Sequence, residues 1–459
     1  MLISEGVILR TPFEPFKPSN FSQAFKTFSK SKAFHEALFL ASPNFYSEIS
    51  KGGSENSEVE LISQFKYYLR MSFRCTPFGM FSGVSSGTVG AKTSFQLLPQ
   101  NTYTKYTRLD NHFLNTFIQR ISSDNVIRKE IKWFANNTIY SNGFSLRYAD
   151  YRLTSNQRSH HLAKVDITTY IESVLAKAQQ GATFNELLGE LVSDEVTVEE
   201  AEAFLDEVIE SKLLLSELEP IVTGEEPYAR LLSILARYKT GAPYVSFLKS
   251  LIGALGKIDE YGPGADITTY EYVLSCIKEW DEKYDPKLVF QSDLSKQGDS
   301  ITLGEDVLRE VKNAIEFLAL LNGNFNHGSL QKFKEEFSKR YEDAEVPLLE
   351  ILDTESGIGY PVGAYAEGDQ SPLIDGFFFL GVSQAIEHKV MPWQKKLMHL
   401  YQQCLQEGKI EIVLTDETFS LDKNLFQEAR LPDSFSSIVS ILGSPDKINE
   451  GDFKIDYKG

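Results

Sequence analysis

Cysteine, long apolar runs and familiar catalytic motifs are all scarce in this chain of 459 residues. Its three cysteines, Cys75, Cys276 and Cys404, are far apart and form no Cys-x-x-Cys pair, so the sequence indicates neither a disulfide framework nor a zinc site. No apolar run approaches the ~18 residues that a membrane span needs. The first residues lack the basic and apolar segments of a signal peptide. We therefore expect a cytoplasmic protein with no membrane span.

Standard catalytic and metal-binding signatures are also absent. The sequence contains no His-Glu-x-x-His, no P-loop lysine motif and no Gly-x-Ser-x-Gly. Gly357-Ile-Gly359 is followed by Tyr-Pro instead of a helix start, which argues against a dinucleotide site. His160 and His161 have no third ligand nearby in the sequence, so a surface pair is favoured over a metal site. We expect neither a metal ion nor a bound cofactor.

Charge is unevenly distributed along the chain. The net charge of −18 argues against a general nucleic-acid-binding protein. Residues 1–150, however, carry 17 Lys and Arg against 11 Asp and Glu, a net charge of +6, which leaves −24 for the remainder. Because 42% of the residues are hydrophobic and 12% aromatic, the chain can form large cores. Any anion binding is therefore expected in the N-terminal part of a folded protein.

The most distinctive pattern lies at residues 70–83. Arg70 and Arg74 are four residues apart at the end of an amphipathic pattern and so share one face of the predicted helix. Two such cations repel by a few tenths of a kcal/mol unless an anion lies between them. Thr76 precedes a proline and therefore leaves the helix. The pattern suits a carboxylate or a phosphate; the alternative is a helix end whose arginines only complement the helix dipole.

The local patterns predict three parts. Residues 1–136 mix helices with short strands, and residues 221–459 are mostly helical, with long helices expected at 228–253 and 270–283. Between them, residues 137–220 show strand patterns, then three helices and a closing strand, which describes a winged-helix unit. Thr183 with Glu186 and Thr197 with Glu200 are spaced as capping boxes at the starts of two of these helices.

Residues 70–83 resemble the Arg-x-x-x-Arg-x-Thr-Pro-Phe-Gly-x-Phe-x-Gly segment of the N-terminal domain of lantibiotic (lanthipeptide) dehydratases. Further segments resemble the same family in the same chain order, over essentially the whole chain: residues 7–12, 107–111, 290–294, 333–337, 346–353 and 357–361. The resemblance implies a multi-part α+β glutamylation domain in which residues 1–136 carry the anion-binding arginines. The winged-helix unit at 137–220 would then be similar to the element that recognises precursors of ribosomally made, modified peptides.

Members of this family transfer glutamate from glutamyl-tRNA, a co-substrate and not a cofactor, to Ser and Thr side chains of a precursor peptide. The resemblance places that chemistry at six residues of this chain: Arg10, Arg70, Arg74, Thr76, Asp110 and Asp293. Guanidinium forks bind carboxylate and phosphate and can stabilise the oxyanion of acyl transfer, and Asp110 can accept a proton or orient an arginine. The alternatives are that Asp110 pairs with Arg108 or caps the next helix, and that Asp293 is a turn acid after a strand.

The winged-helix unit is expected to bind the leader of the precursor peptide by strand addition beside residues 160–167. Candidate groove residues are Leu162, Val165, Phe204 and Val208; the alternative is that they form the core of the unit. Expected partners are the precursor peptide, glutamyl-tRNA, a separate elimination-domain protein and a cyclase, and a homodimer stays open.

Complete family members are much longer, so we expect a fragment or one part of a split system, without elimination activity. Two other functions remain: a peptide ligase that uses aminoacyl-tRNA, and a non-catalytic protein that presents a precursor peptide.

Overall fold

The computed structural model describes residues 4–15, 20–51, 57–154, 157–221, 223–280, 284–322, 328–362, 392–414 and 434–458. The chain divides into two compact units. The first consists of Met1–Gly90 and Ser94–Leu303, and the second of Ala91–Thr93 and Gly304–Gly459. Both units combine helices with strands, which confirms the predicted α+β class.

A six-stranded sheet brings together the two ends of the first unit. Its members are β1 (Gly6–Pro12), β2 (Ser82–Gly90), β3 (Ser94–Leu97), β4 (Thr104–Leu109), β11 (Phe290–Ser295) and β12 (Gly298–Gly304). The order is β3-β12-β2-β11-β4, and β1 pairs with β2. β11 runs antiparallel to β4 and parallel to the start of β2. A strand from residues 290–295 therefore lies between two strands from the first 110 residues.

Four helices and an aromatic core pack beside this sheet. They are α1 (Phe21–Phe28), α2 (Lys32–Ala41), α3 (Pro43–Lys51) and α4 (Glu58–Phe73). α4 begins with a capping box, in which the Ser57 and Glu60 side chains bond each other's backbone N–H groups. Tyr68 on α4 is fully buried, and the rings of Phe21, Phe25 and Phe28 surround it. This packing fixes α4, and with it the arginines near its end, against the sheet.

The rest of the first unit is built around a second, larger core. Its helices are α5 (Asn111–Ser122), α6 (Thr169–Ala178), α7 (Phe184–Gly189), α8 (Val198–Glu210), α9 (Pro227–Leu235), α10 (Ala242–Glu260) and α11 (Ile267–Trp280). One sheet has the order β10-β5-β9, from β5 (Lys132–Ala135), β9 (Ala182–Thr183) and β10 (Leu214–Ser216). Another has the order β6-β7-β8, from β6 (Tyr140–Ser141), β7 (Ser145–Thr154) and β8 (Gln157–Asp166).

The helix starts predicted within residues 137–220 are confirmed. Thr183 and Thr197 each accept a bond from the N–H of the glutamate three residues on, and both capping boxes are complete. The division of the chain at residues 137 and 220 stays a prediction. β5, which precedes residue 137, is the central strand of the sheet that β9 and β10 complete.

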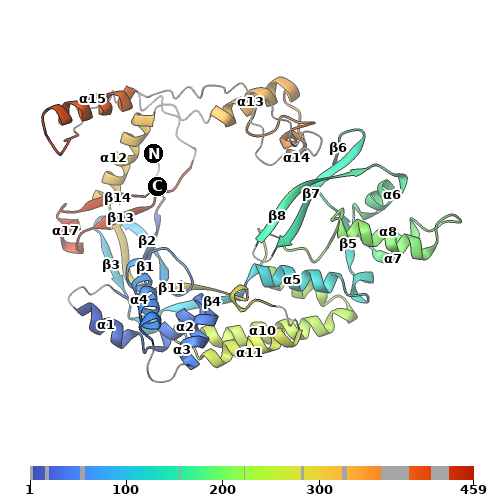
Figure 1. Cartoon of the computed structure of the whole chain (residues 1–459), viewed down its shortest axis with the longest axis horizontal. Helices are drawn as coiled ribbons and strands as arrows, with labels where there is room; N and C mark the ends of the chain where they lie inside the picture. Colours follow the sequence, from blue (N-terminus) through green and yellow to red (C-terminus); the bar gives the residue numbers. More distant parts are fainter. Residues whose placement is uncertain are drawn as a thin grey trace. The chain divides into compact units, whose positions relative to one another are not determined.

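The single long helix predicted at 228–253 is wrong. The segment forms α9 and α10, with a tight turn between them. At Gly241 a Cβ atom would lie 2.2 Å from the carbonyl oxygen of Leu235, so only glycine permits this approach. Pro243 lies in the first turn of α10, where its missing N–H costs nothing. α10 then runs beside α11 (Figure 1).

A buried charged group anchors β4 to α2 and to the loop between α10 and α11. The Glu36 carboxylate pairs with the Lys105 ammonium and accepts bonds from the Tyr270 hydroxyl at 2.7 Å and from the N–H groups of Gly264 and Ala265 at 2.6 and 3.1 Å. Burial lowers the pKa of Lys105, and Glu36 opposes that shift. Because a buried charge is tolerated only when it is paired and hydrogen-bonded, this network holds β4 in one position.

The second unit has α12 (Glu305–Asn322), α13 (Gly328–Tyr341), α14 (Leu348–Leu352), α15 (Pro392–Gln406) and α17 (Pro445–Asn449). Its strands β13 (Val439–Leu442) and β14 (Lys454–Tyr457) pair antiparallel, with α17 between them in the chain. The Arg340 guanidinium donates to the carbonyl oxygens of Ser356 and Gly357 at 2.7 and 2.6 Å. Through the part of the chain that the structure describes, no helix is long and apolar enough to cross a membrane.

Candidate functional site

Arg70 and Arg74 lie at the C-terminal end of α4. Arg70 is in the last turn, and Arg74 is the C-cap residue with extended backbone. Both side chains are exposed, and no hydrogen bond or ion pair joins either guanidinium to another described residue. The predicted helix end is therefore confirmed, and its two cations are exposed and have no counter-ion among the residues that the structure describes.

The turn that follows, at residues 74–76 and called the 74–76 turn below, leads into β2. Thr76 is exposed, and two residues after Pro77 the chain reaches Gly79 at φ +52°. This backbone conformation disfavours a side chain, although open space surrounds the position. Phe81 is buried and its ring contacts that of Phe78, which is exposed. The turn is thus fixed at its far end by an apolar anchor.

The segment after β1 connects Arg10 to this turn. The N–H of Phe13 donates to the Phe81 carbonyl at 2.9 Å, and the N–H of Glu14 donates to the Met71 carbonyl at 2.9 Å. The end of β1 is thereby bonded on one side to the last turn of α4 and on the other to the residues before β2. Arg10, four residues before Glu14, is exposed, and no described residue pairs with its guanidinium.

Strand register places Arg10 and Asp293 on the same face of the six-stranded sheet. Arg10 pairs with Val84, and Val84 pairs on its other edge with Ser295. Since alternate residues of a strand share a face, Asp293 lies on the face of Ser295 and therefore of Arg10. This surface, called the outer face, also carries Tyr106, which pairs with Asp293, and Arg108.

Arg108 and Asp293 form an ion pair on the outer face. The Arg108 Nη1 lies 2.5 Å from the Asp293 Oδ2, with the two side chains 29% and 55% exposed. The Arg108 guanidinium is also 5.6 Å from the centre of the Tyr106 ring. Asp293 lies within β11 and not in a turn after it, so the interpretation of Asp293 as a turn acid is wrong.

Asp110 has the structural role that was the alternative to catalysis. It is the N-cap of α5, and its Oδ1 accepts a bond from the His112 N–H at 2.7 Å. Its own N–H donates to the Val289 carbonyl at 2.7 Å, next to β11. Arg108 pairs with Asp293 and not with Asp110. A catalytic role for Asp110 stays a prediction.

Lys296 is a buried cation that the sequence patterns did not single out. It follows β11 and is 3% exposed, and its Nζ donates to the Pro12 carbonyl at 2.7 Å. Burial lowers its pKa to about 8, and Cys75 and Glu14 oppose that shift. One signal was present: Ser292, Leu294 and Lys296 follow the alternation of β11, so a lysine continues the strand's buried face.

The four predicted groove residues fall into two groups. Leu162 on β8 is 51% exposed, whereas Val165, three residues on, faces the core from the opposite side of the strand. On α8, Val208 is 3% exposed and belongs to the core, and Phe204 is half-buried against Tyr170. β8 is an edge strand of the β6-β7-β8 sheet. Leu162 and Phe204 therefore offer side-chain surface to a partner, and Val208 does not.

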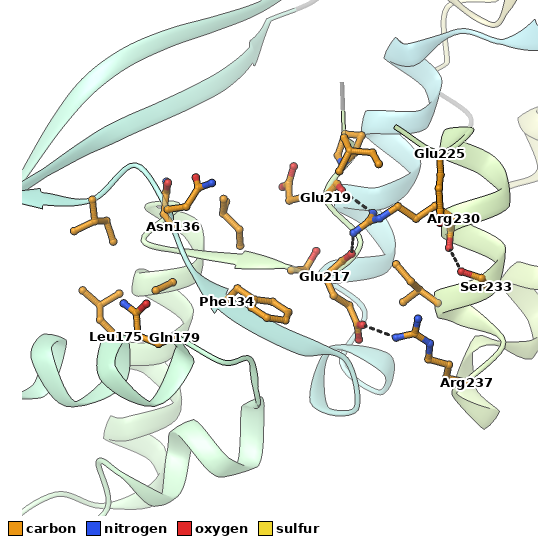
Figure 2. A pocket seen from close by; sticks show the side chains of 18 residues that line it. Phe134, Asn136, Leu175, Gln179, Glu217, Glu219, Glu225, Arg230, Ser233 and Arg237 are labelled. Carbon is orange, nitrogen blue, oxygen red and sulfur yellow. Dashed lines mark hydrogen bonds and ion pairs between the residues drawn. The ribbon is translucent and has the colours of Figure 1, made fainter. Parts of the chain in front are cut away.

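A cavity of about 900 Å³ lies elsewhere in the first unit, between β10, the strand β5 and helices α6 and α9. Figure 2 shows Arg230 and Arg237 reaching from the side of α9 toward the end of β10. Arg230 donates to the carbonyl oxygens of Glu217 and Glu219 at 2.8 and 2.9 Å. The Glu217 carboxylate accepts from Arg237 at 3.5 Å and from the hydroxyl of Tyr238. The charges in this cavity are thus used to hold β10, and none of the predicted site residues lines it.

Across the described ranges, no three His, Cys, Asp or Glu side chains lie close enough together to hold a metal ion.

The family described as "Lantibiotic dehydratase, N terminus" matches residues 30–458. Among curated proteins, nisin biosynthesis protein NisB of Lactococcus lactis subsp. lactis is 25% identical over 355 residues, which cover 75% of this chain and 34% of NisB. Epidermin biosynthesis protein EpiB of Staphylococcus epidermidis is 24% identical over 342 residues, which cover 72% of this chain and 34% of EpiB. The chain spans about a third of the length of these relatives.

Among solved structures, the tRNA-dependent lantibiotic dehydratase MibB from Microbispora sp. 107891 matches with a TM-score of 0.71 and 21% identity, covering 99% of this chain and 43% of MibB. The glutamylation domain of TbtB from thiomuracin biosynthesis, bound to 5'-phosphodesmethylglutamycin, matches with a TM-score of 0.51 and 14% identity, covering 87% of this chain and 50% of that one. These two matches concern the fold. The match over residues 30–458 establishes the family: this chain belongs to the lantibiotic dehydratases and corresponds to their N-terminal region.

Proposed function

We propose that this chain takes part in tRNA-dependent glutamylation, transferring glutamate from glutamyl-tRNA to Ser and Thr hydroxyl groups of a precursor peptide. The observation that carries the proposal is the set of three exposed guanidinium groups, Arg10, Arg70 and Arg74, which have no counter-ion among the described residues. Family membership and the fold similarity to a tRNA-dependent dehydratase and to a glutamylation domain support the same chemistry.

The arginines suit the ligand. Glutamyl-tRNA presents phosphodiesters and a side-chain carboxylate, which guanidinium forks bind bidentately. During transfer the ester carbonyl becomes an oxyanion, and a fixed cation beside it stabilises that charge. α4 and the bonds from Phe13 and Glu14 hold the backbone on either side of the 74–76 turn, so the backbone that carries Arg70 and Arg74 is in place before the ligand binds.

Asp293 is the acid best placed to act on the peptide hydroxyl. It is more than half exposed, it lies on the outer face with Arg10, and Arg108 holds its carboxylate. A carboxylate in this position can accept the proton of the attacking hydroxyl. Asp110 acts through structure in this proposal, because it fixes the start of α5 beside β11.

Leader recognition is assigned to residues 137–220 as a winged-helix unit. The three helices α6, α7 and α8 with the hairpin of β7 and β8 support this assignment. An extended peptide can add to β8, whose outer edge is unpaired among the described strands. Leu162 and Phe204 provide apolar contacts there, which accords with the partial burial of Phe204.

Mass spectrometry of a precursor peptide incubated with glutamyl-tRNA and this chain tests the function directly. We expect a gain of one glutamyl residue per modified Ser or Thr, mapped to side chains by fragmentation. Glutamine-charged tRNA is the matched control, because it has the same backbone but a neutral side chain.

Two results would redirect the proposal. A C-terminal extension of the peptide indicates a peptide ligase. Leader binding without any mass gain, even when the part of a longer relative that this chain does not match is added in trans, indicates a non-catalytic presenter.

A further inference from the structure

Lys296 stands out because it is a buried lysine that forms no ion pair with a carboxylate of the described residues. Its side chain is 3% exposed. Lysines are almost never fully buried unless they are paired. The position therefore calls for a physical reason other than surface solvation.

The contacts of the ammonium group are specific. Nζ donates to the Pro12 carbonyl at 2.7 Å and lies 4.9 Å from the centre of the Tyr103 ring. The backbone N–H of Lys296 donates to the Val84 carbonyl at 2.8 Å, which extends the pairing of β11 with β2 by one residue. Lys296 thus ties three strands together, since Pro12 ends β1, Val84 is in β2 and Lys296 follows β11.

Gly83, the last residue of the 70–83 pattern, leaves the space that the Lys296 side chain occupies. A Cβ atom at Gly83 would lie 2.6 Å from Cγ and 2.8 Å from Cδ of Lys296. Both distances are shorter than real side-chain contacts, so the lysine stem crosses the sheet directly over Gly83. The glycine that closes the pattern is therefore explained by the lysine, and the two positions form one unit.

The Pro12 carbonyl lies next to the backbone bonds that hold the residues flanking the 74–76 turn. The next two residues, Phe13 and Glu14, bond to the residues on either side of that turn. Burial raises the pKa of the Cys75 thiol, inside the turn, and the positive charge of Lys296 opposes that shift. Lys296 is thus bonded to Pro12, next to the residues that hold the turn, and its charge acts on Cys75 within the turn.

We propose that Lys296 is a positioning residue of the glutamyl site: as an ammonium ion it holds the Pro12 carbonyl and places a positive charge behind the 74–76 turn, so that the turn binds its anionic ligand tightly only while this lysine is charged. The inference rests on the proposed function, since it assumes that the ligand is the glutamyl end of a charged tRNA.

The charge of Lys296 can change within an accessible pH range. Glu14 after β1, Cys75 in the turn and Tyr103 before β4 are the titratable groups that face it. With a pKa of about 8, the lysine is charged at pH 7 and mostly neutral at pH 9. Arginine keeps its charge throughout this range, so Arg10, Arg70 and Arg74 do not contribute to the change.

Binding of an amide-linked, non-hydrolysable mimic of the glutamyl-tRNA acceptor end tests the inference. Wild type and Lys296→Arg are compared between pH 7 and pH 9. The affinity of wild type should fall about tenfold more than that of the arginine variant, as follows if only the charged lysine supports binding with a pKa of about 8. Titration of the mimic itself cancels in this comparison, because it affects both proteins equally.

Three further variants complete the experiment. Lys296→Met should bind weakly at every pH, and Gly83→Ala should weaken binding because its methyl group displaces the lysine stem. Lys287→Met, which removes an exposed lysine just before β11, should match wild type. Equal pH profiles for wild type and Lys296→Arg would overturn the inference alone, whereas absence of binding by wild type at pH 7 would overturn the proposed function together with it.

A second measurement does not depend on glutamyl transfer. Alkylation of Cys75 by iodoacetamide at pH 8, followed by peptide mass spectrometry, should slow in Lys296→Met because the thiolate loses a nearby positive charge. Cys276 and Cys404 in the same chain serve as internal controls. An unchanged rate at Cys75 would refute the placement of the ammonium behind the turn.

Discussion

Two groups of arginines in the first unit differ in what their guanidinium groups contact. Arg230 donates to two carbonyl oxygens at the end of β10, and Arg237 pairs with Glu217. Arg70 and Arg74, at the end of α4, are exposed and have no such partner among the described residues. Arginines of the first group hold the fold together, and those of the second group leave their hydrogen-bond donors available to a ligand. Substitutions should therefore separate the two groups cleanly.

The largest effect is expected for Arg74→Ala. Loss of a guanidinium that stabilises the transition state should lower the rate of glutamyl transfer by about 100-fold or more, while leader binding and thermal stability stay as in wild type. Arg74→Lys should recover only part of the activity, since it keeps the charge but loses the bidentate fork. Initial rates with glutamyl-tRNA, together with leader titration, measure both quantities.

Lys66→Ala is the matched control for Arg74→Ala. It removes an exposed cation from the same helix, one turn before Arg70. Transfer at the wild-type rate is expected. An equal loss in both variants would mean that general positive charge on α4 matters and that Arg74 has no specific position at the site.

The second effect is on stability. Arg230→Met removes two charge-assisted bonds to the Glu217 and Glu219 carbonyls and should lower the free energy of unfolding by about 2 kcal/mol. Urea denaturation with an unchanged m-value measures it. Arg237→Met, whose ion pair is mostly solvent-exposed on the arginine side, should cost less than about 1 kcal/mol. A loss of transfer in Arg230→Met without a loss of stability would contradict the division into two groups.

How much of this could be predicted depends on the range of the interactions. The α4 helix end, the capping boxes at Thr183 and Thr197 and the cap at Asp110 are local, and residue types at fixed spacing determine them. The insertion of β11 between β2 and β4 joins residues about 200 positions apart, and no local pattern encodes the partner.

The burial of Lys296 follows from that same insertion and could not be deduced from local spacing. Gly83 belongs to the 70–83 pattern, but the need for a glycine there comes from the Lys296 side chain that lies over it. Likewise, the helix ends between α9 and α10 because the chain at Gly241 packs against the Leu235 carbonyl. The helical periodicity of residues 228–253 gives no sign of this contact. In each case the glycine indicates a close contact, but the sequence pattern around it does not identify the residue that it contacts.

Arg108 shares features of both groups of arginines, because its side chain is partly exposed and also pairs with a carboxylate. Its substitution should have the smallest effect on stability of those considered. The paired carboxylate is that of Asp293 on the outer face. A double-mutant cycle of Arg108→Gln and Asp293→Asn should give a coupling free energy of about 0.5 kcal/mol for unfolding, as is usual for exposed pairs. In transfer assays Asp293→Asn should cause the larger loss, because the proposed proton acceptor is the carboxylate and Arg108 only orients it. A coupling free energy above about 2 kcal/mol, with equal activity losses in both single variants, would instead place this pair with Arg230 as part of the structural framework.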